Sequence, residues 1–353
     1  MFDIVDIRPD GETVRALIPE FYQKLAENDY TAALTIIDNA GQKITEAAEK
    51  LLQTTTADIQ IRYQQLITEI IGEFSSPTGQ KLYTALDDFG NKMRIQHKTS
   101  QWQMLRERDI SGLRPIDHFL VFEVCLPGEQ RTLLQQIRNR LFKLDALRIE
   151  LHNKISDAIW TVLNEVKPYG EVEDLTVEHL GNNEGTELEA LYAAAEAYPA
   201  GWISKLSDYN ILRVTQSVTG GGFYSSEENL IGIATRISDK GYPDGTSSAI
   251  HELAHAMERA IPALQDLENA FLTVRKETKF DAWVDPYFER VYDDGSLEIF
   301  AAGIEALFVG AYGSLIGLGS IGAVIPLPDY PSTGSVPDDG LRNFVLGTLS
   351  LLE

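Results

Sequence analysis

Cysteine is nearly absent from this chain of 353 residues, since Cys125 is the only one. A single cysteine cannot form a disulfide within the chain, so the sequence does not indicate an oxidising compartment. It also excludes a zinc site built from several thiolates. Any metal ion bound here must therefore be held by histidine and carboxylate side chains.

Basic residues are scarce as well. The chain has 30 Lys and Arg residues against 53 Asp and Glu residues, which gives a formal net charge of -23. A surface of this charge repels nucleic-acid phosphates and anionic lipid headgroups within a Debye length. We therefore expect no nucleic-acid partner.

The first ten residues, MFDIVDIRPD, lack the basic start and the uninterrupted apolar run of a signal peptide. We therefore expect no export by the ordinary route. One run, at 306–328, contains no charged residue and is long enough to span a bilayer. Five glycines interrupt it and no basic residues flank it, so we interpret it as buried or loop structure. A membrane-active protein is the alternative.

Hydrophobic residues make up 44% of the chain and charged residues 24%, which is enough apolar material for a folded protein of two regions. In the first region, apolar residues recur with helical spacing over 32–74 and follow a heptad rhythm over 134–158. Two such helices predict a hairpin or bundle within residues 1–168. We interpret this region as a helical stalk that contacts a protein partner.

The pattern changes after the segment KPYG at 167–170, where proline and glycine interrupt the helical period. Residues 169–353 combine a helix at 187–197 with strands at 211–218 and 229–234. Tyr224 and the strand at 229–234 precede the motif described next, and an edge strand there would bind an extended peptide. An ordinary structural strand is the alternative. The sequence therefore predicts an α+β fold with two domains, 1–168 and 169–353.

The segment HELAH at 251–255 is the strongest chemical signal. Hydroxyl residues at 246–248 are expected to cap its helix, and Pro262 to stop it after about residue 260. His251 and His255 are four residues apart, so both imidazoles project from one face and can bind a single zinc ion. In such motifs the carboxylate at the position of Glu252 takes a proton from zinc-bound water. The alternative is two histidines that share a helix by chance.

A third ligand must come from elsewhere, because the longer motif that adds a third histidine fails at Glu258 and Ile261. Glu298 and Glu305 are seven residues apart on an apolar helical segment, hence on nearly the same face. A buried carboxylate is costly without a partner, which a metal ion or a metal-bound histidine supplies. The two glutamates are about 10 Å apart along the helix.

We therefore assign Glu298 as the third zinc ligand and Glu305 as the carboxylate that holds a ligand histidine. The choice between Glu298 and Glu305 as ligand stays open at this point. A solvated helix face that carries both glutamates is the alternative.

HELAH followed by a helix that begins at Glu298 resembles the gluzincin arrangement, and the segment EIFA at 298–301 is similar to the ligand helix of the anthrax lethal factor-like metallopeptidases. This resemblance implies a zincin-like fold for residues 169–353. It also implies a catalytic tyrosine in the loop before the ligand helix. Tyr292 is the best match, with Tyr287 as the second candidate.

The end of the chain carries a second resemblance. The helix from Glu298 to Phe308, the segment PDD at 337–339 and the segment NFVLG at 343–347 are together similar to the metallopeptidase-like tails of bacteriophage minor head proteins. This implies a virion-associated or prophage-encoded protein, as against an ordinary cytoplasmic one.

These observations predict a zinc-dependent metalloendopeptidase that cleaves a peptide or protein substrate. In this hypothesis Glu252 is the general base and then donates the proton to the leaving amine, while Tyr292 steadies the oxyanion. The alternative is a structural or virion-assembly protein that keeps a zincin fold without turnover.

Overall fold

The computed structural model describes residues 6–52, 56–85, 126–169, 175–180, 185–217, 221–234, 245–277, 288, 290–292, 295–309 and 338–353. The chain divides into two compact units. Unit 1 combines Met1–Gln53, Ile155–Val309 and Asp338–Glu353, and unit 2 combines Thr54–Lys154 and Gly310–Pro337. Residues 168 and 169, between which the sequence analysis placed a domain boundary, both lie in unit 1.

Unit 2 contains an antiparallel pair of helices. They are α4 (Ala57–Ser75) and the part of α8 (Gly128–Val166) that precedes residue 155. Arg140 of α8 contacts Glu69 and Glu73 near the end of α4, at 2.9 and 2.8 Å, whereas Glu150 lies 4.0 Å from Arg62 near its start. The two helices therefore run in opposite directions. The helix expected over 32–74 consists of α4 and a separate helix of unit 1, with Thr56 outside both.

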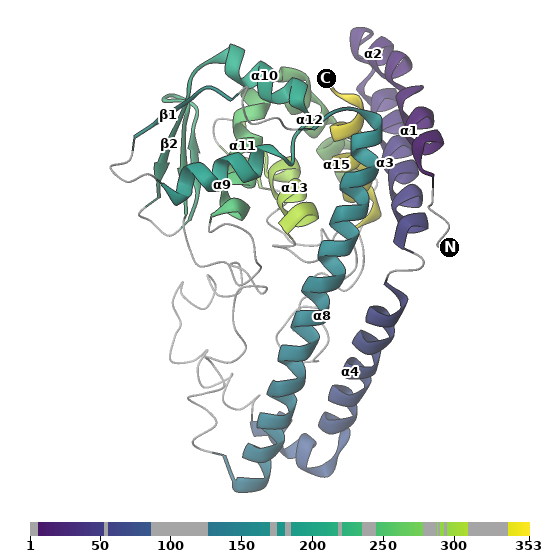
Figure 1. Ribbon diagram of the computed structural model, residues 1–353, viewed down its shortest axis with the longest axis vertical. Helices are drawn as coiled ribbons and strands as arrows, with labels where there is room; N and C mark the ends of the chain where they lie inside the picture. Colours follow the sequence, from purple (N-terminus) through teal and green to yellow (C-terminus); the bar gives the residue numbers. More distant parts are fainter. Residues whose placement is uncertain are drawn as a thin grey trace. The chain divides into compact units, whose positions relative to one another are not determined.

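The helical part of unit 1 is built around the pair α3 and α15 (Figure 1). Its elements are α1 (Arg8–Arg15), α2 (Ile18–Ala26), α3 (Tyr30–Leu52) and α15 (Asp339–Leu351). Glycines allow the two backbones to approach closely. A Cβ atom at Gly41 of α3 would lie 2.2 Å from the Asn343 carbonyl oxygen, and one at Gly347 of α15 would lie 2.1 Å from the Ile37 carbonyl oxygen.

Unit 1 also contains a small mixed sheet. Its strands are β1 (Val177–His179), β2 (Leu212–Gln216), β3 (Phe223–Ser225) and β4 (Leu230–Ile233), in the order β1-β2-β4-β3. The first two pairings are parallel, and β3 is antiparallel to β4. The described chain is therefore α+β and mainly helical. Of the two interpretations of residues 229–234, an edge strand or an ordinary structural strand, the structure supports the second, because β4 is paired on both sides and β3 lies at the end of the sheet.

Five further helices belong to unit 1. They are α9 (Thr186–Ala195), α10 (Ala200–Tyr209), α11 (Thr246–Ala260), α12 (Pro262–Glu277) and α13 (Ile299–Val309). The central helix is α11, which contacts the other four as well as β3 and β4 (Figure 1). Every residue from Ala249 to Glu258 is buried. The HELAH segment thus lies on a helix enclosed by protein, where polar side chains require partners.

The start of α11 differs from the prediction. Gly245 occupies the N-cap position with a φ of 90°, a left-handed conformation that glycine adopts without steric cost. The expected hydroxyl cap is wrong, since Ser247 donates a hydrogen bond to Glu305 and Ser248 accepts one from the Ala234 backbone N–H. Pro262 does end α11, and it also opens α12, where its missing N–H costs nothing.

No helix among the described residues combines the length and the hydropathy that crossing a membrane needs. Most of the uncharged run at 306–328 lies outside the described residues.

Candidate metal centre

His251 and His255 lie side by side on α11, with their ring centroids 5.1 Å apart. Both are buried, together with Glu252, and the three side chains offer ligand atoms within 4.8 Å of one another. The four-residue spacing on a helix produces this pairing directly. Among the described residues, this group could hold a metal ion.

Each imidazole contacts a carboxylate through its Nδ1 atom. His251 Nδ1 lies 3.1 Å from Glu305 Oε2, and His255 Nδ1 lies 3.1 Å from Glu258 Oε1. A carboxylate accepts hydrogen bonds, so both contacts fit a histidine that carries a proton on Nδ1. This arrangement leaves Nε2 as the atom that each histidine can offer to a metal.

Glu298 faces the Nε2 atoms of both histidines. Its Oε2 atom lies 2.9 Å from His251 Nε2 and 3.7 Å from His255 Nε2. Glu298 directly precedes α13 and is 1% exposed. Of the two glutamates considered in the sequence, Glu298 thus meets both imidazoles, whereas Glu305 contacts the opposite nitrogen of one.

These distances suit a metal ion with nitrogen and oxygen ligands. Zinc binds such atoms at about 2.0 to 2.1 Å, so neighbouring ligand atoms of a tetrahedral site are about 3.4 Å apart. The two separations measured from Glu298 Oε2, 2.9 and 3.7 Å, bracket that value. Two imidazoles and one carboxylate, each imidazole held by a further carboxylate, are ligand types that zinc accepts.

The surrounding carboxylates shift the titration of the histidines. Burial lowers the pKa of His251, but hydrogen bonds with Glu298 and Glu305 outweigh it and raise this pKa well above its usual value. For His255, burial is again outweighed, by hydrogen bonds with Glu258 and Glu298, which raise its pKa to about 9. Burial raises the pKa of Glu298, yet its contacts with both histidines lower it far below the usual range.

Glu252 lies against the segment that enters β3. A Cβ atom at Gly222 would lie 2.4 Å from Glu252 Oε1 and 2.3 Å from Ser248 Oγ. Position 222 must therefore remain small for the Glu252 carboxylate to occupy this place. Burial raises the pKa of Glu252, because a buried charge is less stable than a buried neutral acid.

Tyr292 contacts the same glutamate as the histidines. Its hydroxyl group donates a hydrogen bond to Glu298 Oε1 at 2.5 Å, and the Arg290 guanidinium lies 4.6 Å from the centre of its ring. The residue lies in the segment before α13. Tyr287, the second candidate, lies outside the described residues.

Sequence reasoning missed two acidic residues near the centre, Glu258 and Glu268. The spacing of three residues between His255 and Glu258 on one helix was a usable signal. Glu268 had no such signal, because it belongs to α12 and its partner, the backbone N–H of Phe300, is distant in the chain.

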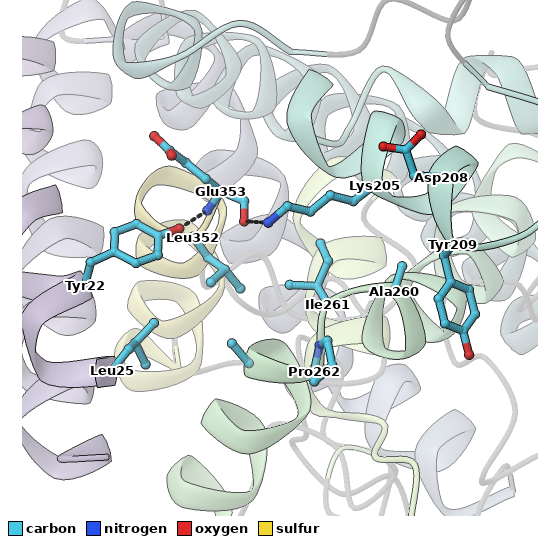
Figure 2. Close-up of a pocket in the computed structure, with 11 residues that line it drawn as sticks. Tyr22, Leu25, Lys205, Asp208, Tyr209, Ala260, Ile261, Pro262, Leu352 and Glu353 are labelled. Atoms are coloured by element: carbon cyan, nitrogen blue, oxygen red, sulfur yellow. Dashed lines mark hydrogen bonds between the residues drawn. The ribbon is translucent and has the colours of Figure 1, made fainter. Parts of the chain in front are cut away.

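A pocket of about 470 Å³ occupies another part of unit 1 (Figure 2). Tyr22 and Lys205 reach Glu353 there from two sides, and the end of α11 forms part of the wall. Its lining contains none of His251, Glu252, His255, Glu298 or Glu305. The pocket is therefore separate from the candidate metal centre.

Comparisons with protein-family models, with curated proteins and with solved structures found no match for this chain.

Proposed function

We propose that this protein is a zinc-dependent metallopeptidase whose metal ligands are His251, His255 and Glu298. One observation carries the proposal: the Nε2 atoms of both histidines converge on Glu298 Oε2, while their Nδ1 atoms are held by Glu305 and Glu258. Carboxylates in that outer position fix the ring orientation of zinc-binding histidines. The proposal includes the zincin-like fold and the gluzincin arrangement to which the sequence bears a resemblance.

The chemistry assigned to each side chain follows from its environment. A bound zinc ion would polarise a substrate carbonyl and lower the pKa of its bound water. Glu252 accepts a proton and later returns it to the leaving amine; its raised pKa brings it closer to the working pH of such a base. The Tyr292 hydroxyl donates its one proton to Glu298 Oε1, so it would have to turn away from Glu298 to donate a hydrogen bond to a developing oxyanion.

The proposed substrate is an extended peptide segment that lies beside β3. This strand ends the sheet within the described residues, and it follows Gly222, whose backbone approaches the Glu252 carboxylate. An edge strand offers backbone N–H and C=O groups to an added chain. Peptide bonds of any sequence carry the same groups, so this mode of binding suits a protease.

The test of the proposal is metal content, measured by elemental analysis of the purified protein after reconstitution with zinc. We expect about one zinc ion per chain in the wild type, none in Glu298→Ala, and weakened binding in Glu305→Ala, because loss of an outer carboxylate costs about 10- to 100-fold in affinity. Absence of zinc from the reconstituted wild type would contradict the proposal. Zinc without any detectable cleavage would instead indicate a structural metal site.

Zinc affinity is expected to increase with pH. Zinc requires unprotonated Nε2 atoms. The pKa of His255 is about 9, and that of His251 is well above its usual value, so both imidazoles of the metal-free site keep protons at neutral pH. Binding must therefore displace protons, and affinity rises until the pH passes these pKa values, by up to about tenfold per pH unit for each proton released. Competition with a chelator between pH 6.5 and 9 measures this trend. An affinity that does not vary with pH would contradict it.

A further inference from the structure

The first turn of α13 is capped by a residue from a different helix. Glu298 directly precedes Ile299, the first residue of α13, and so occupies the N-cap position. A side chain there commonly accepts a hydrogen bond from one of the first backbone N–H groups of its own helix. The Glu298 carboxylate is directed instead to the two histidines and to Tyr292.

Glu268 of α12 accepts the hydrogen bond that this turn offers. Its Oε1 atom lies 2.8 Å from the backbone nitrogen of Phe300, the second residue of α13. Glu268 is 0% exposed, and its Oε2 atom has no hydrogen-bond partner among the described residues. Phe300 is fully buried too, with its ring 5.6 Å from that of Trp202. A backbone N–H in such a place needs an acceptor within the protein.

We propose that Glu268 is a positioning residue for Glu298: it caps α13 from α12 and thereby leaves the Glu298 carboxylate available to the metal. The inference rests on the proposed function and extends it to a residue outside the ligand set. Without this cap, the Phe300 N–H would have the Glu298 side chain as a nearby acceptor, because an N-cap side chain reaches the N–H groups of that turn. The Glu298 carboxylate would then be drawn away from the histidines.

The chemical state of Glu268 suits a permanent cap. Burial raises its pKa well above the usual value, and the charge of Glu258 adds to the effect. A neutral carboxyl group still offers its carbonyl oxygen to Phe300, at a lower desolvation cost than a carboxylate. Glutamine has the same shape and the same acceptor, so Glu268→Gln is expected to preserve the cap, whereas Glu268→Leu removes it.

The experiment compares the wild type, Glu268→Gln, Glu268→Leu and a matched control, Glu187→Leu. Glu187 is another buried glutamate of unit 1, and it contacts His179 on β1. Chelator competition with zinc is expected to show about 10- to 100-fold weaker binding for Glu268→Leu alone. Equal zinc affinity of Glu268→Leu and the wild type would overturn the proposal, as would an equal loss in Glu187→Leu.

Two further readouts use the metal-free protein, so they do not depend on zinc binding. Amide exchange at Phe300 is expected to accelerate in Glu268→Leu and to stay slow in Glu268→Gln. The ¹⁵N chemical shifts of the His251 and His255 rings are expected to change in Glu268→Leu only, because Glu298 moves. If the wild type binds no zinc, the metallopeptidase proposal fails while these two measurements still decide the role of Glu268. Unchanged exchange or unchanged ring shifts in Glu268→Leu would overturn it.

Discussion

Cleavage by the Glu252→Gln variant is expected to be about 10²- to 10⁴-fold slower than cleavage by the wild type, with zinc still bound. Glutamine keeps the size of the side chain and its fit against Gly222 but cannot accept the proton from an attacking water. The measurement is the initial rate on a peptide identified by screening the wild type against a peptide library, together with the zinc content of both proteins.

Two outcomes would contradict this role for Glu252. Wild-type cleavage by the glutamine variant would show that another group takes the proton. Loss of zinc from the variant would show that Glu252 is itself a ligand, which its proximity to His251 and His255 allows. Glu187→Gln serves as a control, since its contact with His179 lies outside the ligand set.

Gly347→Val is expected to destabilise unit 1 by about 3 kcal/mol. The Cβ atom alone would lie 2.1 Å from the Ile37 carbonyl oxygen, so α15 and α3 would have to move apart. That movement would open a contact formed along much of both helices. Denaturant unfolding of the zinc-free protein, followed by circular dichroism, measures the loss.

Gly201→Val is the matched control for this substitution. It also introduces valine into a helix of unit 1, but no atom lies within 4 Å of a Cβ at Gly201. The helix propensity of valine is therefore common to both variants, and only the collision differs. Equal unfolding midpoints for Gly347→Val and Gly201→Val would contradict the close packing of α3 and α15.

The sequence predicted best those features that depend on short spacings. HELAH specifies a helix with two histidines on one face, and α11 does extend from Thr246 to Ala260 as expected. The separation of seven residues placed Glu298 and Glu305 on nearly one face of an apolar segment, and each is buried and contacts His251. A helical period carries this information without knowledge of the rest of the chain.

Features that depend on contacts between distant segments were missed or wrong. The interior place of β4 follows from its pairing with both β2 and β3, which the strand's own residues do not encode. The cap that Glu268 provides to α13 joins two helices across 32 positions of sequence. The backbone conformation at Gly245 likewise displaced the expected hydroxyl cap. In each case contacts with distant segments determined the structure, and the local sequence pattern was compatible with more than one arrangement.

The packing of α13 and α3 against α15 also joins segments that are made at different times. Val345 of α15 lies against Gly303 of α13, the helix that follows Glu298, and Gly347 lies against α3. During translation, HELAH at 251–255 is made before α15 (Asp339–Leu351). The surface that supports the helix after Glu298 is therefore absent until α15 has emerged. The arrangement of Glu298 beside the two histidines can be completed only after that point.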